Sequence, residues 1–141
     1  MVNTTILSQY RDGRPWETIE RKISGGPLYP KDELLTFLAD HGSDGIRQWT
    51  QKCISDLQAL ELNQEDIFDQ VRQALLTGTF LGSQWCERHE GGPWAACDAY
   101  HFYRREWFAK LMKYMECEYY LKLAMSKTGV LLLLISFHPS R

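Results

Sequence analysis

The sequence lacks an apolar run long enough to cross a lipid bilayer. Its longest apolar stretch, residues 130–137, spans eight positions, whereas a transmembrane helix needs about 20. The opening residues, MVNTTILSQYRDGR, also lack the apolar segment that an export signal carries. Cysteine is sparse, with four in 141 residues. We therefore expect a cytoplasmic protein whose thiols are reduced, without a membrane partner.

A strong charge of either sign is absent as well. The chain has 16 Lys and Arg against 18 Asp and Glu, which argues against tight, sequence-blind DNA binding because that function needs a clearly basic face. The two parts of the chain differ, however. Residues 1–85 contain eight basic and twelve acidic side chains, and residues 86–141 contain eight and six. Any basic face is therefore expected in the C-terminal part.

The sequence contains no P-loop, dinucleotide-binding fingerprint, HExxH motif or EF-hand. One pattern suggests a metal site: Cys86, His89, Cys97 and His101 are of the residue types that bind zinc. The seven residues between its two pairs make a short loop, so zinc is the less favoured interpretation, and small buried cysteines with surface histidines are the simpler one. A nucleophilic pair of Cys97 with His101 or His138 lacks the local features that activate a thiolate.

Glycine, proline and apolar spacing predict helices in the first part of the chain. A short helix is plausible at 16–23. Pro30 predicts a helix start, and the helix is expected to run to Asp40 before Gly42. A further helix, capped by Ser43 or Asp44, is predicted to reach position 60, and another is predicted from the Asn63 cap to Gly78.

After position 78 the pattern changes to short extended segments. Strands are predicted at 79–86, 96–103, 118–125 and 130–137, and turn residues separate them at 90–93 and 126–129. Residues 104–114 fit a helix slightly better than a strand. The predicted fold class is therefore α+β, with N-terminal helices packed on a C-terminal antiparallel sheet, whose last two strands form a hairpin.

One set of side chains suits RNA cleavage. Tyr120 and Lys122 project to the same face of their strand because strand side chains alternate. His138 is expected at the same end of the sheet, on the partner strand of the hairpin. A neutral-pH acid/base beside a phenol, with a cation from Lys122, Arg104 or Arg105, is what attack by the RNA 2′-hydroxyl requires.

Several short motifs occur in a fixed order along the chain. They are LYPKDEL at 28–34, a helical segment at 66–76, Phe80, CDAY at 97–100, YLK at 120–122 and LISF at 134–137. In this order they resemble the MqsR family of RNase toxins, which are similar in fold to RelE-type toxins. The resemblance covers residues 27–141, expected to form a single α+β toxin-like domain. Residues 1–26 are expected to be an N-terminal extension, and 103–115 is a further addition to the family's plan.

The resemblance implies a bacterial, metal-independent mRNA-cleaving endoribonuclease that needs no cofactor. It also implies the toxin role of a type II toxin–antitoxin system, arresting growth until a cognate antitoxin protein binds. The family's four active positions fall at Gly82, Cys97, Tyr120 and His138. Only the tyrosine is retained, and the histidine stands where the family has a lysine. That histidine can still move protons near neutral pH.

These observations lead to a ranked set of hypotheses. The first is an endoribonuclease, and the second is a non-catalytic protein-interaction module, with or without a stapling zinc. A third is a nucleic-acid binder that stacks bases without cleaving them. The residues assigned to the first hypothesis are Tyr120, His138 and Lys122 for catalysis, and Arg88, Arg104, Arg105 and Tyr100 for RNA binding.

Overall fold

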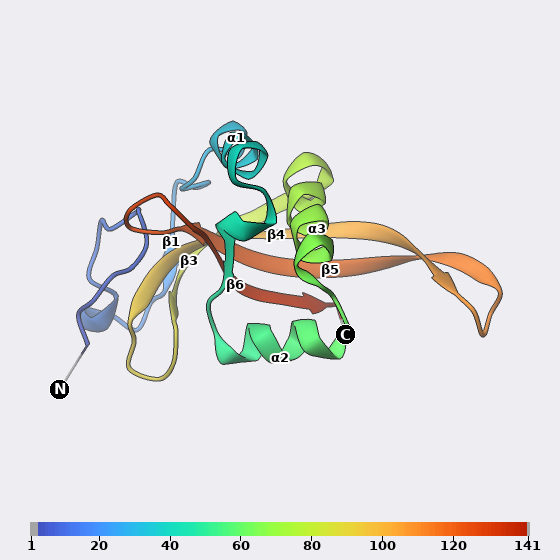
Figure 1. Cartoon of the computed structure of the whole chain (residues 1–141). Helices are drawn as coiled ribbons and strands as arrows, with labels where there is room; N and C mark the ends of the chain where they lie inside the picture. The colour runs from blue at the N-terminus through green and yellow to red at the C-terminus, as the bar shows by residue number, and fades with distance from the viewer. Residues whose placement is uncertain (1–2, 141) are drawn as a thin grey trace.

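In the computed structural model, residues 3–140 are described and fold into helices and one six-stranded sheet (Figure 1). The helices are α1 (Lys31–His41), α2 (Gln51–Ala59) and α3 (Gln64–Thr77), with short 3-10 turns η1 (Pro15–Glu17) and η2 (Gly42–Gly45). The strands are β1 (Lys22–Ile23), β2 (Ile46–Gln48), β3 (Thr79–Glu87), β4 (Trp94–Phe108), β5 (Lys113–Met125) and β6 (Leu132–Pro139). The predicted α+β class is confirmed.

The strand order across the sheet is β1-β3-β4-β5-β6-β2. Strands β3 to β6 are antiparallel neighbours, as predicted, but β2 pairs with β6 in parallel. The sheet is therefore mixed. The prediction of an antiparallel sheet confined to the second part of the chain is wrong, because β1 and β2 reach the sheet from the first part and form its two edges.

Two of the predicted helices are confirmed closely. Helix α1 follows Pro30, and α3 begins with a capping box in which the Asn63 side chain and Asp66 bond each other's backbone N–H groups. The helix predicted from Ser43 or Asp44 is wrong in its first turns. That segment instead forms η2 and β2, and α2 starts only after Thr50, whose hydroxyl accepts the Cys53 N–H.

Two other helix predictions are wrong for the same physical reason, which is pairing with a distant strand. Residues 22–23 of the predicted 16–23 helix join β3 as β1. Residues 104–114 are mostly strand, because β4 and β5 continue their pairing far beyond the body of the sheet as a long hairpin (Figure 1). The last strand also begins later than predicted, at Leu132, since Val130 is exposed.

One apolar core draws side chains from all three helices and from the sheet. Helix α2 contacts β6, α3 contacts β4, and α1 contacts α3. Fully buried members of this core are Leu34, Leu38, Leu57, Ile67, Leu75, Tyr100, Phe102, Leu121 and Phe137. Along β4 the buried Tyr100 and Phe102 alternate with the more exposed His101 and Tyr103. The same strands therefore present a second face outside the core.

The pairing of β5 with β6 contains a one-residue shift. Lys122 lies opposite Ser136 but Leu123 lies opposite Leu134, so Ile135 is the additional residue of a β-bulge. Before the bulge β6 is buried at every position, and after it Ser136 and His138 are half-buried while Phe137 is buried.

Within residues 3–140, no helix has the length and apolar character needed to span a membrane.

A buried carboxylate joins the segment before α1 to the middle of the sheet. The Asp98 side chain is fully buried and accepts the backbone N–H groups of Leu28 and Tyr29, both at 3.0 Å. It also accepts the Ser83 hydroxyl at 2.6 Å. Residues 3–26 are held nearby, because Leu7 and Gln9 donate backbone hydrogen bonds to β4 and β5. This polar cluster connects segments about 70 residues apart through one side chain.

We expect Asp98→Ala to lower the free energy of unfolding by about 3–5 kcal/mol, because three buried donors lose their acceptor. Urea denaturation followed by circular dichroism measures this loss. Asp69→Ala is the matched control, since Asp69 is exposed on α3. A loss below about 1 kcal/mol for Asp98→Ala, the scale of one ordinary hydrogen bond, would contradict the role assigned to this carboxylate.

Candidate functional site

Three rings form a row across the centre of the sheet, which we call the ring row (His101, Tyr120 and His138). They come from β4, β5 and β6, where His101 is paired with Tyr120 and Tyr120 with His138. The ring centroids of His101 and Tyr120 are 5.9 Å apart, and those of Tyr120 and His138 are 5.8 Å apart. Both pairs are stacked, at interplanar angles of 21° and 27°. The row lies on the face opposite the buried aromatic residues of the same strands.

Both imidazoles of the ring row have one nitrogen engaged. Nδ1 of His101 lies 2.7 Å from a carboxylate oxygen of Glu118, and Nδ1 of His138 lies 2.9 Å from the backbone carbonyl of Pro139. Both partners accept hydrogen bonds, so each Nδ1 carries the proton and Nε2 remains as the acceptor of the neutral ring. This arrangement orients the imidazoles and leaves Nε2 of each for proton exchange.

A small pocket opens beside the ring row. It has a volume of about 220 Å³, below the roughly 300–1,000 Å³ of a typical small-molecule site. Its lining residues are Leu81, Ala99, Tyr100, Tyr120, Leu121, Lys122, Ser136 and His138. The structure thus brings together all three predicted catalytic residues, because Lys122 follows Tyr120 by two positions on β5 and pairs with Ser136 on β6.

Two residues extend the site away from the pocket. The Glu118 and His101 side chains are 23% and 21% exposed, so their contact is only partly open to solvent. Tyr103 packs edge-on against His101, with ring centroids 5.7 Å apart. The Glu118 carboxylate raises the pKa of Tyr103 by electrostatic repulsion of the phenolate and by accepting the phenol hydrogen bond.

Three of the predicted RNA-binding residues make their main contacts with other parts of the protein. Tyr100 is only 1% exposed and belongs to the core, where burial raises the pKa of its phenol to about 12. Arg104 lies on the opposite face of β4 from His101 and approaches Glu106. Arg88 donates to the backbone carbonyl of Trp49 and lies over its ring. Tyr100 nevertheless lines the pocket beside the ring row, and Arg88 lines a second pocket together with Lys122. Their role in RNA binding stays a prediction, whereas Arg104 does not share a face with Tyr120.

Gly82 and Cys97, the two other positions at which the MqsR resemblance predicts active residues, carry no side chain into the pocket beside the ring row. Gly82 lies at a second bulge, opposite Ala99, with a φ of +148° that favours glycine. Cys97 is fully buried, and burial raises the pKa of its thiol. The neighbouring Cys97 thiol lowers the pKa of Cys86. Both cysteines are free thiols, and neither lines the pocket beside the ring row.

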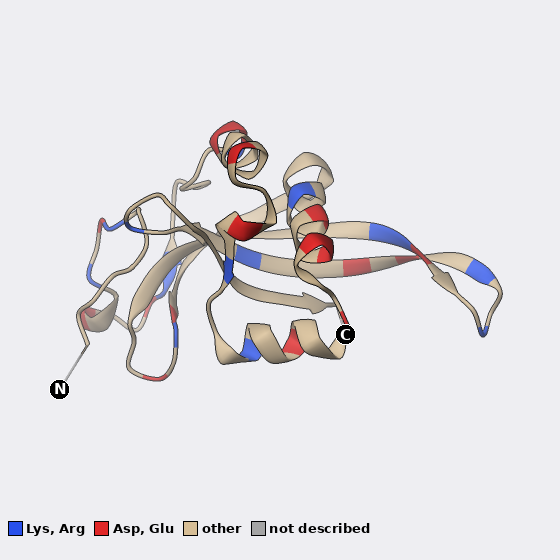
Figure 2. Cartoon of the chain, viewed as in Figure 1, with Lys and Arg blue, Asp and Glu red and all other residues tan. Residues whose placement is uncertain are grey.

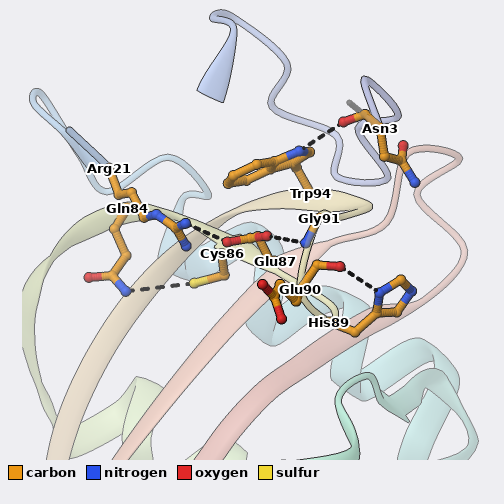
Figure 3. Close-up of polar contacts among 9 residues, drawn as sticks. All are labelled: Asn3, Arg21, Gln84, Cys86, Glu87, His89, Glu90, Gly91 and Trp94. Carbon is orange, nitrogen blue, oxygen red and sulfur yellow. Dashed lines mark hydrogen bonds and ion pairs between the residues drawn. The ribbon is translucent and has the colours of Figure 1, made fainter. Parts of the chain in front are cut away.

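The four residues of the zinc pattern are not gathered at one point. Within residues 3–140, no cluster of three or more His, Cys, Asp or Glu side chains could hold a metal ion. Figure 3 shows the Cys86 sulfur directed at the Gln84 amide, while the His89 ring turns outward to the Glu90 carbonyl. His101 is bound to Glu118 instead. The loop at 87–91 is closed by Glu87, which pairs with Arg21 and accepts the Gly91 N–H (Figure 3).

His101 and Glu118 are the site residues that the sequence interpretation missed. His101 was considered only as a metal ligand or a thiol partner, and Glu118 only as part of a strand. A signal was present, since His101 precedes Tyr103, and Glu118 precedes Tyr120, each by two positions. Two strands with this spacing place three polar rings and one carboxylate on one face, provided that the strands are paired in the observed register.

No protein-family model, curated protein or solved structure matches the chain. The site must therefore be interpreted from its own chemistry. It combines a phenol, an ammonium group and one imidazole at a pocket with a second imidazole and a carboxylate beside it on the same sheet face. That set can transfer protons in both directions near neutral pH and can bind an anion.

We expect Glu118→Gln to lower the pKa of Tyr103, because the negative charge that opposes formation of the phenolate is removed. An NMR titration of ring-labelled tyrosine measures the shift. Glu106→Gln is the control: Glu106 bonds the Tyr119 hydroxyl on the other face, so this change should lower the pKa of Tyr119 and leave that of Tyr103 in place. An unchanged Tyr103 in Glu118→Gln would contradict the assigned contact.

Proposed function

We propose that the protein is a metal-independent endoribonuclease that cleaves single-stranded RNA through attack of the RNA 2′-hydroxyl on the adjacent phosphorus. The ring row carries this proposal. His101 and His138 present free Nε2 atoms on either side of Tyr120, and Lys122 lies in the adjoining pocket. Imidazole is the side chain best suited to exchange protons near neutral pH.

The reaction needs two proton transfers and one charge stabiliser. Nε2 of His138 takes the proton of the 2′-hydroxyl as the O2′–P bond forms. His101 acts in its imidazolium form: Glu118 accepts the Nδ1–H, and the Nε2 proton passes to the leaving 5′-oxygen as the P–O5′ bond breaks. The Tyr120 hydroxyl and the Lys122 ammonium group bind the non-bridging oxygens, on which negative charge increases in the transition state. The products are a 2′,3′-cyclic phosphate and a 5′-hydroxyl end.

We further propose the biological role of a bacterial toxin whose cognate antitoxin protein blocks the ring row. The MqsR-like order of motifs supports this role, with Tyr120 retained at an active position and His138 at another. An arrangement of helices packed on a central sheet, as in RelE-type toxins, is part of the same proposal. Burial of the open face of β4, β5 and β6 against the antitoxin would favour such binding.

We expect His138→Ala and His101→Ala each to lower the rate of RNA cleavage by about 10²- to 10⁴-fold, the usual contribution of a general acid or base. Cleavage of a labelled single-stranded RNA, with assay of 2′,3′-cyclic phosphate ends, measures this. His89→Ala is the control, because His89 is exposed and lies outside the ring row. EDTA should leave the rate unchanged. Wild-type protein that leaves RNA intact would refute the proposal.

The toxin role has a separate test. Induced expression of the wild type in bacteria should arrest growth and deplete mRNA, whereas expression of His138→Ala should allow growth because the base is lost. Comparable amounts of folded protein, checked by immunoblot of the soluble fraction, make the comparison valid. Equal growth of the two strains, despite RNA cleavage by the purified wild type, would leave an RNase without the proposed toxin role.

A further inference from the structure

The hairpin of β4 and β5 projects from the body of the protein as a two-stranded arm (Figure 1). We call residues 104–117 the outer hairpin. Strands β4 and β5 pair without a register shift from Asp98 opposite Leu123 to Phe108 opposite Lys113. Strand side chains alternate between faces, so the face that bears His101 and Tyr120 continues outward without interruption. The open face of the site is therefore longer than the pocket itself.

The side chains along this continuation are mainly aromatic. Tyr103 lies against His101, and two positions further are Arg105 and then Trp107. Trp107 and Tyr114 are paired across the strands, with ring centroids 5.1 Å apart. The Arg105 guanidinium lies over the Tyr114 ring at 4.9 Å. The two rings meet edge-on, at an interplanar angle of 62°. Exposed aromatic rings of this kind suit base stacking, because every base has a π-face and Arg adds a cation–π contribution.

These rings are accessible to a ligand. Trp107 is 53% exposed and Tyr114 is 55% exposed. An exposed Trp of this kind retains most of its apolar surface for a contact. Trp107 follows His101 by six positions on one strand, which corresponds to about 20 Å at the usual rise per residue. A strand of RNA with its phosphate at the ring row could thus extend along the arm to these rings.

The charge of the outer hairpin fits a polyanion. It carries Arg104, Arg105, Lys110 and Lys113 against two acids, Glu106 and Glu116, and basic segments recur along the arm (Figure 2). Glu106 is engaged by the Tyr119 hydroxyl on the other face. The remainder of the chain has an excess of acidic residues. Counted over both faces, the arm is therefore the locally basic part of an acidic protein. On the face of Trp107 and Tyr114, Arg105 lies opposite Glu116, whereas Arg104 and Lys113 project to the other face.

We propose that the outer hairpin is a binding arm for single-stranded nucleic acid, with Trp107 and Tyr114 stacking on bases and Arg105 contacting a phosphate. This inference rests on the proposed function, since it states where the same RNA lies outside the scissile bond. In this proposal the arm binds the strand and takes no part in cleavage of the phosphodiester bond. Its expected contribution is affinity for unpaired strands over duplexes, whose bases are not free to stack on these rings.

The test uses a fluorescein-labelled oligothymidylate of twelve nucleotides, which has no 2′-hydroxyl and cannot be cleaved. Fluorescence anisotropy with the full-length protein gives the Kd. Trp107→Ala should raise the Kd by about 5- to 150-fold, the usual effect of losing one stacked base. Trp107→Phe should retain most of the affinity because it keeps a ring. Leu111→Ala is the matched control: Leu111 is similarly exposed, at 57%, but has no ring.

Salt dependence gives a second readout. Arg105→Gln should reduce the slope of log K against log salt concentration by about 0.7, the value for one phosphate contact to a single strand. An equal Kd for Trp107→Ala and wild type would overturn the proposal. So would equal weakening by Leu111→Ala and Trp107→Ala, which is the result expected if the arm is a general apolar docking surface for a protein.

The two proposals can fail separately. If the oligothymidylate binds through Trp107 but RNA remains uncut, the cleavage proposal fails and the arm stands as a nucleic-acid binding element. If RNA is cut through His138 and the Trp107 variants bind as wild type does, the arm proposal fails and the nuclease remains. The non-cleavable probe makes this separation, since its affinity does not depend on proton transfer at the ring row.

Discussion

The register of β4, β5 and β6 is the constraint on which the site depends. Phe102 against Tyr119 and Leu121 beside Phe137 are buried pairs, and their burial sets which residues face away from the core. In a strand, a slip of one position exchanges the two faces completely. Apolar contacts of the buried residues in the same strands therefore determine the position of the ring row. Burial of these aromatic side chains stabilises the sheet, and the open face follows from the same pairing.

The elements with local signals could be predicted, and those that depend on distant pairing could not. Asn63 caps α3 through its own side chain and Asp66, so its effect is visible within four residues of sequence. Ile46 has helical spacing with later apolar residues, yet its segment pairs with β6 about 85 residues away. Residues 104–114 likewise contain apolar spacing that suits a helix. Their strand conformation comes from extension of a hairpin whose register is set in the core.

The site was predictable to a similar extent. Tyr120, Lys122 and His138 follow from a hairpin with a short turn, and the structure places them beside one pocket. His101 could not be assigned in the same way, because its position depends on β4 pairing with the other side of β5. Arg104 illustrates the reverse error: it is adjacent in sequence to Arg105 but projects to the other face. Proximity in sequence is a poor guide where strands alternate.

The bulge at Ile135 links the position of α2 to the orientation of the last residues of β6. Without that additional residue the last part of β6 would have the opposite parity, with Phe137 turned to solvent and His138 turned inward. The carbonyl of Ile135 accepts a hydrogen bond from the Thr50 hydroxyl, and the same hydroxyl accepts the Cys53 N–H in the first turn of α2. The Thr50 hydroxyl oxygen thus links the start of α2 to the bulge residue that sets the face on which His138 lies. A displacement of α2 along its axis would pull directly on the bulge.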